Sequence, residues 1–133
     1  MAEIELLVGG YPPAKGEAMS MLGAKHSHAP RVRLHLTSAA QALNTGQAVY
    51  LESAAIGLEL TLWCPRDRMR GDATNYLGGI GDVLKAKGHR SGTEHLAQLA
   101  QVAFYDNDRQ IEEVHYYWQQ AVEASYRLRL WRI

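Results

Sequence analysis

Two short acidic segments hold side chains whose type and spacing suit chemistry on phosphate groups. The first lies in residues 71–84, and its oxygen-bearing side chains near the start are Asp72, Thr74 and Asn75. The second is the turn at residues 106–108, with a carboxylate at Asp106 and at Asp108. Mg²⁺ prefers such oxygen ligands and keeps several waters, which it activates for phosphodiester hydrolysis. If folding brings the two segments together, they predict a Mg²⁺ or Mn²⁺ site.

Each side chain has an expected role in that site. Asp72 and Asp108 are the expected direct ligands, and the side chains expected to bind directly or through water are Asn75, Asp106 and Thr74. Asp82 lies seven residues beyond Asn75, which is about 10.5 Å along a helix axis. We therefore expect Asp82 to act outside the direct ligand set, or as a cap.

Both acidic segments also have a purely structural interpretation. Asp72 follows Gly71 at a position where a carboxylate caps the start of a helix. The Asp-Asn-Asp sequence at 106–108 is typical of a turn. Either segment alone favours the structural role, and the two together, with their flanking strands, place the metal site level with it.

Basic side chains flank the acidic segments and are candidates for contact with DNA phosphates. They are Arg66, Arg68, Arg70, Lys15, Lys85 and Lys87. The guanidinium fork of arginine matches the oxygens of a phosphate group. The alternative is a solvated loop, in which the arginines pair with Asp67 or other acids. The same two readings apply to Arg127, Arg129 and Arg132 near the end of the chain, because the wet face of an edge strand often carries arginine.

Composition narrows the class of protein. The 133 residues are 47% hydrophobic and carry 14 basic and 14 acidic side chains, which fits one globular domain of zero net charge. A strongly basic DNA-binding domain is excluded, although a local basic face is not. Cys64 is the only cysteine, so no disulfide forms within the chain and we expect a cytoplasmic location. No apolar run reaches the length of a membrane span, so no membrane partner is expected.

Hydrophobic periodicity predicts the elements that position these side chains. Alternating apolar residues predict strands at 3–8, 56–64, 111–118 and 125–133. Helical spacing predicts a helix at 31–43 and a short helix at 93–101 with Leu96 inward. It also predicts a helix that starts after Asp72, and its inward residues are Tyr76, Ile80, Val83 and Leu84. Residues 14–30 are expected to be a mobile loop, and a loop at 119–124 to join the last two strands as an antiparallel hairpin.

Three glycines, Gly78, Gly79 and Gly81, fall inside the predicted second helix. Each costs about 1 kcal/mol relative to alanine in a helix interior. Close packing of backbone against a strand or a second subunit is the favoured reason, and a phosphate cradle is the alternative. The order of elements predicts a single α+β domain, with a mixed four-stranded sheet and helices mainly on one face.

The arrangement of motifs resembles the RusA-type family of Holliday-junction resolvases. Asp72, Asn75 and Asp82 match the acidic helix start and mid-helix Asp of that family, and residues 107–111 match its acidic pair and following strand. The turn at Tyr11-Pro12-Pro13 resembles the one after the family's first strand. The resemblance implies a RusA-like fold over residues 1–133, a homodimer, and a Mg²⁺-dependent endonuclease that acts on branched DNA in recombination and repair.

The chain departs from the family pattern at four places. Thr74 stands where the family has a second Asp, and Gly78 stands where it has Lys. Asn107 replaces the first acid of the pair, and residues 86–103 are an insertion with a short helix. A cation would then have to come from Lys85, Lys87 or Arg70. The alternative function is a RusA-like domain that binds DNA or a protein without cutting.

Overall fold

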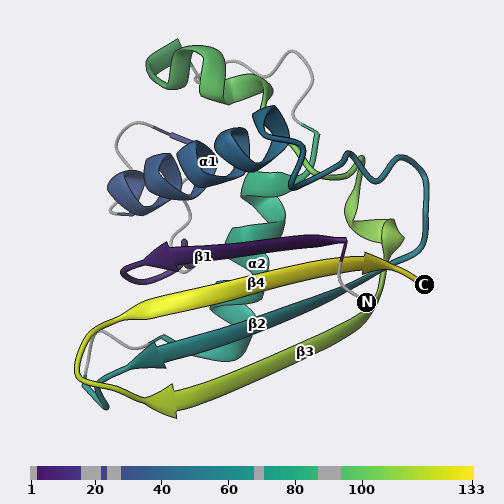
Figure 1. The fold of residues 1–133 in the computed structure, drawn as a ribbon. Helices are drawn as coiled ribbons and strands as arrows, with labels where there is room; N and C mark the ends of the chain where they lie inside the picture. Colours follow the sequence, from purple (N-terminus) through teal and green to yellow (C-terminus); the bar gives the residue numbers. More distant parts are fainter. Residues whose placement is uncertain (1–2, 16–21, 24–27, 68–70, 87–93) are drawn as a thin grey trace.

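Four strands form one mixed sheet in the order β1-β4-β2-β3 (Figure 1). The strands are β1 (Ile4–Gly9), β2 (Ile56–Cys64), β3 (Ile111–Gln120) and β4 (Ser125–Arg132). Strand β4 is antiparallel to both β1 and β2, and β2 is parallel to β3. This computed structural model describes residues 3–15, 22–23, 28–67, 71–86 and 94–133. The predicted α+β class and mixed four-stranded sheet are confirmed.

The predicted hairpin of the last two strands is wrong, because β2 lies between β3 and β4. Leu60 of β2 pairs with Leu128 of β4 on one side and with Tyr116 of β3 on the other. Strand β2 is the most buried strand, so it takes a central place with a neighbour on each side. The connection from β3 to β4 passes the end of β2, where the Ala121 amide donates to the Cys64 carbonyl at 3.1 Å. Strand β4 is therefore central, and its arginines do not lie on an edge strand.

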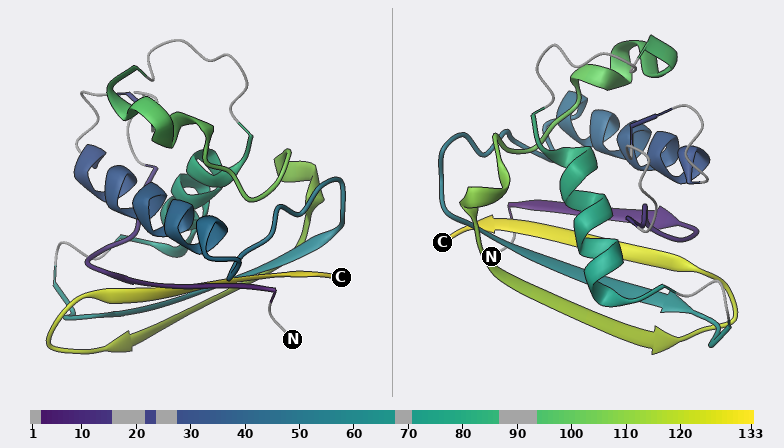
Figure 2. Two further views of the ribbon diagram at one scale, coloured as in Figure 1. Left: turned by 45° about the horizontal axis from the view of Figure 1, so that its top comes forward. Right: turned by 180° about the vertical axis from the view of Figure 1, so that it is seen from behind.

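Both long helices cover the same face of the sheet (Figure 2). They are α1 (Ala29–Asn44) and α2 (Ala73–Leu84), and the predicted helix at 31–43 is confirmed within α1. Two 3-10 helices follow, η1 (Glu94–Gln101) and η2 (Asp108–Gln110). The predicted short helix corresponds to η1, which is 3-10 rather than α and is broken at Ala97, where φ is 51°. No helix in the described part of the chain is both long and apolar enough to cross a membrane.

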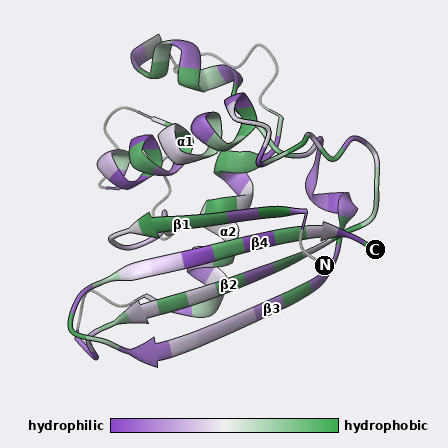
Figure 3. Cartoon of the chain, in the orientation of Figure 1, coloured by the Kyte–Doolittle hydropathy of each residue, from purple (hydrophilic) through white to green (hydrophobic). Residues whose placement is uncertain are grey.

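The core lies between the helices and the covered face of the sheet. Strand residues at alternate positions point into it, such as Leu58, Leu60 and Leu62 of β2, and Figure 3 shows this alternation of hydrophobic and hydrophilic residues along the strands. The predicted inward stripe of α2 is confirmed, because Tyr76, Ile80, Val83 and Leu84 are fully buried. A second, smaller cluster joins α1, α2 and η1, and it consists of Leu22, Val32, Leu36, Val83 and Leu96.

The glycines of α2 allow a loop to pack closely on the helix. A Cβ atom on Gly79 would lie 2.4 Å from the carbonyl oxygen of Pro13. The same loop is tied to α2 by the Lys15 amide, which donates to the Asn75 carbonyl at 2.8 Å. Close backbone packing therefore explains Gly79, but its partner is the loop after β1 and not the predicted strand or second subunit. Most of the predicted loop at 14–30 lies outside the described residues.

Candidate functional site

Asp72 is the N-cap of α2. Its Oδ1 accepts a hydrogen bond from the Asn75 amide at 2.9 Å and another from the Thr74 hydroxyl at 3.0 Å. The bond from the Asn75 backbone, and then the bond from Thr74, hold the pKa of this exposed carboxyl below its ordinary value. The structural interpretation of Asp72 as a cap is thus confirmed.

Asp108 lies at the other end of α2. It opens η2, after a capping box formed by Asn107 and Gln110. The Lys85 ammonium, at the C-cap of α2, donates to Asp108 Oδ2 at 3.0 Å. The Tyr105 hydroxyl lies 3.3 Å from Asp108 Oδ1 and 3.2 Å from the Gly81 carbonyl. Asp108 is therefore anchored to the last turn of α2.

The expectation that Asp72 and Asp108 share one ion is wrong within a single chain. Helix α2 has 12 residues, so its ends are about 18 Å apart at 1.5 Å per residue. The reason is topological, because α2 starts after the last residue of β2. Strand β3 is parallel to β2, and its first residue, Ile111, pairs with Ile56 at the opposite end of the strands. Asp72 follows the end of β2 and Asp108 precedes the start of β3.

The other predicted ligands are dispersed as well. Thr74 and Asn75 stay with Asp72, whereas Asp106 accepts hydrogen bonds from the Tyr50 hydroxyl and from the Ser53 amide. These two bonds lower the pKa of Asp106, the one from Tyr50 more strongly. Within the described ranges, no group of three or more His, Cys, Asp or Glu side chains is placed to hold a metal. The predicted five-residue ligand set is therefore not assembled.

The structure instead gathers two carboxylates and two ammonium groups at the end of α2. We call Lys15, Asp82, Lys85 and Asp108 the α2 C-terminal cluster. Lys85 Nζ lies 3.0 Å from Asp108 and 3.4 Å from Asp82, and Lys15 Nζ lies 3.2 Å from Asp82. The hydrogen bond to Asp108 is the main cause of a raised pKa for Lys85. Asp82, expected outside the ligand set, is at the centre of this cluster.

Sequence reasoning missed this cluster, although one signal for it was present. Asp82 and Lys85 are three residues apart on a helix, and side chains at that spacing are neighbours. Both lysines were expected to contact DNA phosphates, and in this structure both pair with carboxylates. The contribution of Lys15 could not be read from spacing, because it comes from the loop after β1.

The remaining basic candidates occupy a different region. The Arg66 guanidinium stacks over the Trp118 ring at 4.6 Å. The Asp67 carboxylate accepts from the Tyr11 hydroxyl at 3.3 Å, and burial followed by the charge of Asp67 raises the pKa of Tyr11 to about 12. The predicted contacts at Arg68, Arg70 and Lys87 lie outside the described residues.

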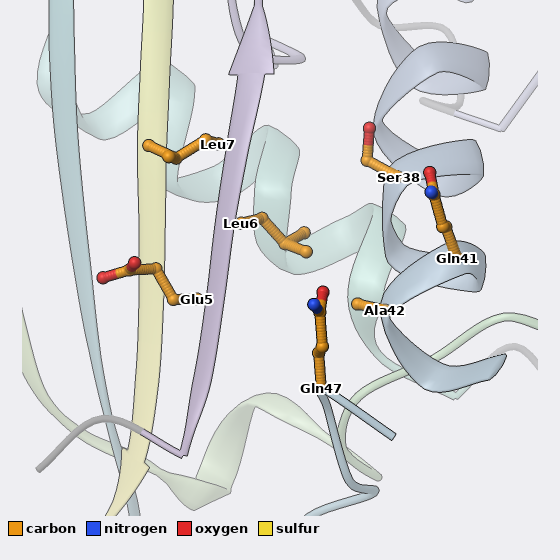
Figure 4. Close-up of a pocket in the computed structure, with 7 residues that line it drawn as sticks. All are labelled: Glu5, Leu6, Leu7, Ser38, Gln41, Ala42 and Gln47. Atoms are coloured by element: carbon orange, nitrogen blue, oxygen red, sulfur yellow. The ribbon is translucent and has the colours of Figure 1, made fainter. Parts of the chain in front are cut away.

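Two of the hollows on the helix side lie beside α2 and beside β1. One, of about 500 Å³, lies beside the start of α2 and is lined by Gly71, Asp72, Ala73, Asn75 and Tyr116. The other, of about 440 Å³, lies between β1 and the end of α1 (Figure 4), and its lining includes none of the predicted site residues. No protein-family model and no curated protein matches this chain.

Proposed function

We propose that this chain is a RusA-like, Mg²⁺-dependent endodeoxyribonuclease that acts on branched DNA such as Holliday junctions, with its chemistry at the α2 C-terminal cluster. The observation that carries the proposal is the position of Lys85, whose ammonium group lies between the carboxylates of Asp82 and Asp108. The motif resemblance at Asn75, Asp82 and residues 107–111 supports the choice of substrate.

The donor set fits a hard divalent ion that keeps part of its water shell. Mg²⁺ is commonly held by one or two carboxylates together with water and substrate phosphate, and Asp82 and Asp108 would supply those carboxylates. When bound, the ion supplies positive charge and a water of lowered pKa. Lys15 and Lys85 already lie within 3.4 Å of these acids, so both are placed to hold an anionic phosphate beside them. Tyr105 orients Asp108 through its hydroxyl.

The test is cleavage of a labelled four-way junction in the presence and absence of Mg²⁺ or Mn²⁺. We expect Asp82→Asn and Asp108→Asn to lower metal-dependent cleavage by at least about 100-fold, because each removes half of the ligand charge. The matched control is Asp72→Asn at the other end of α2, since asparagine caps helices as well as aspartate does. It should cleave like the wild type.

Two results would contradict this assignment. One is loss of cleavage in Asp72→Asn with full cleavage in Asp108→Asn. The other is a gain of Mg²⁺-dependent cleavage in the double variant Thr74→Asp/Gly78→Lys, which restores the family pattern near the start of α2. Either result would place the chemistry at the start of α2, near Asp72.

A second candidate is a RusA-like domain that binds duplex or branched DNA, or a protein, without cutting. The observation that favours it is charge balance, because Lys15 and Lys85 already neutralise Asp82 and Asp108 without any metal. Such a domain would bind a junction in a gel-shift assay, yet show no saturable Mg²⁺ or Mn²⁺ binding by calorimetry. An enzyme would show both.

Assembly and location belong to the same proposal. The resemblance supports a homodimer, and light scattering that gives the monomer mass of 14.8 kDa at every concentration would contradict it. Cys64 is a free, fully buried thiol, which is compatible with the reducing environment of the cytoplasm.

A further inference from the structure

The sheet has a second face, which neither α1 nor α2 covers (Figure 2). Its side chains come from the alternate positions of all four strands, and the register aligns them in rows across the sheet. One row is Leu7, Arg127, Thr61 and Tyr117, and the row beside it is Glu5, Arg129, Glu59 and His115. This face is therefore rich in flat side chains, both aromatic rings and guanidinium groups.

A hollow lies in the middle of this face, above Thr61. Its volume is about 490 Å³, and its lining includes Glu59, Thr61, Trp63, Tyr117 and Arg127. Thr61 is only 5% exposed, so it forms the floor between larger neighbours. Tyr117 and Arg127 flank it on the two adjacent strands, at the positions that pair with Thr61. The small Thr61 side chain lies between the planar groups of Tyr117 and Arg127. The hollow therefore has walls that suit a planar ligand.

The rings around the hollow are held in place by one another. His115 stacks with Tyr117 at a centroid distance of 6.4 Å and with Trp131 at 6.2 Å. Arg127 lies over the Trp63 ring at 5.7 Å, and the Trp63 indole donates to Gln119 at 2.7 Å. Tyr117 is nevertheless 51% exposed. A planar ligand can therefore stack on the exposed Tyr117 ring, whose orientation is already fixed by its neighbours.

The charges on this face single out Arg127. Arg129 pairs with Glu5 at 3.4 Å and with Glu59 at 3.5 Å, so its charge is taken up by these two carboxylates. In contrast, Arg127 makes no ion pair within the described part of the chain. The Nε atoms of both arginines are buried without a hydrogen-bond partner among the described residues, so the ion pairs alone distinguish Arg127 from Arg129. Arg127 is therefore the cation at the hollow that is available to an anion.

We propose that this face binds single-stranded nucleic acid, with one unstacked base in the hollow above Thr61. Tyr117 stacks on the base, and Arg127 faces a phosphate of the same strand. Proteins bind single strands by this combination of aromatic stacking and backbone neutralisation, often on an open four-stranded sheet. The site lies on the opposite face of the sheet from the α2 C-terminal cluster, so it extends the proposed nuclease function and does not depend on it.

A second copy of this chain is the less favoured occupant. Stacking two such faces would bury Glu5, Arg129 and Glu59, which together carry one excess negative charge, and burial of charges carries a desolvation cost. The exposed apolar residues that would offset that cost are Leu7 and Tyr117. A strand of nucleic acid covers only the hollow, whose lining includes Glu59, and leaves Glu5 and Arg129 in water.

The test is fluorescence anisotropy with labelled twelve-nucleotide oligo(dT) and oligo(rU) in EDTA, so that no cleavage occurs. We expect the wild type to bind, and the two oligonucleotides together show whether the site prefers DNA or RNA. Tyr117→Leu should weaken binding by about 5- to 100-fold, the range for loss of one stacked base. Tyr117→Phe keeps the ring and should stay within about twofold of the wild type.

Two further variants separate charge from stacking. Arg127→Gln should reduce the slope of log K against log salt by about 0.7, the value for one phosphate on a single strand. The control Leu7→Ala removes an exposed apolar side chain from the same row as Tyr117 and should bind like the wild type. Asp108→Asn should also bind normally, whether or not it abolishes cleavage, which keeps this test independent of the nuclease proposal.

The proposal is overturned if the wild type does not bind either oligonucleotide, or if Tyr117→Leu binds as tightly as the wild type. It is equally overturned if light scattering shows a dimer that Tyr117→Leu dissociates while neither form binds an oligonucleotide. That result would assign the open face to contact between copies.

Discussion

Two neighbouring glycines of α2 should respond to the same substitution with opposite signs. Gly79 faces the backbone of the loop after β1, where an added Cβ would lie 2.4 Å from the Pro13 oxygen, 2.7 Å from the Pro13 carbonyl carbon and 2.9 Å from the Ala14 nitrogen. All three atoms belong to the main chain, so no side chain can rotate to make room. At Gly78 the nearest atoms are the Lys15 Cδ and Cβ at 3.5 and 3.6 Å, which is ordinary contact.

The expected magnitude for Gly79→Ala combines three terms. Alanine in a helix interior is favoured over glycine by about 1 kcal/mol. Overpacking costs about 1–3 kcal/mol, and moving the loop weakens the bond from the Lys15 amide to Asn75, which contributes about 0.5–1.5 kcal/mol. The net loss is about 2 kcal/mol of the free energy of unfolding, or roughly 8 °C in Tm for a domain of this size. Gly78→Ala lacks both penalties and should gain up to about 1 kcal/mol.

Urea denaturation followed by far-ultraviolet circular dichroism measures both variants. The midpoint should fall for Gly79→Ala and rise for Gly78→Ala while the m-value stays constant, because the same surface unfolds in each. A Gly79→Ala protein at least as stable as the wild type would refute the reasoning. It would mean that the loop yields without cost, and that close packing does not explain this glycine.

Two other predictions concern single hydrogen bonds. The buried Tyr126 hydroxyl forms a hydrogen bond with His35 Nδ1 in the core. Tyr126→Phe should therefore lower the free energy of unfolding by about 1–3 kcal/mol in the same urea assay, because it leaves a buried polar group without this partner. An unchanged midpoint would contradict that role. The pKa of Asp72 is held below its ordinary value of 3.8, so its contribution to stability is present above pH 3.8 and is lost as the pH falls through the lower, folded-state pKa. The stability difference between the wild type and Asp72→Ala should therefore shrink in acid, and a difference independent of pH would show that the ionised carboxylate does not matter.

Local features of this fold could be read directly from the sequence. The alternation at residues 56–64 places Leu58, Leu60 and Leu62 on the covered face of β2. The three- and four-residue spacing of Tyr76 and Ile80 places both at the buried side of α2. These predictions succeed because each depends only on the geometry of one element and on which of its sides is apolar.

The neighbours of a strand could not be read in the same way. The short loop predicted at 119–124 suggests a hairpin, but that pattern describes only β3 and β4, not β2. Strand β2 is apolar enough to need a partner on each side, and Leu60 pairs with both Leu128 and Tyr116. The strand order follows from burial of the whole sheet, and the connection from β3 to β4 crosses the end of β2.

The same limit explains why the predicted ligand set dispersed. Asp72 precedes α2 and Asp108 precedes β3. The sequence alone does not say that α2 and β3 begin at opposite ends of the strands. The parallel pairing of Ile56 with Ile111 is what separates them. Conversely, Lys15 reaches Asp82 only because Gly79 lets the loop after β1 lie against α2, a contact with no signature in residue spacing.

The dipole of helix α2 favours a cation at the C-terminal end of the helix over one at its N-terminal end. The start of a helix is its positive end, so the Asp72 carboxylate is already stabilised there, both by the dipole and by the amide of Asn75. The end of a helix is negative and disfavours carboxylates, yet Asp82 and Asp108 both lie at that end. Two acids in an unfavourable field require positive charge beside them, and Lys15 and Lys85 supply it in this structure. A divalent cation would gain from the two carboxylates and from the dipole together, whereas at Asp72 the dipole would oppose it.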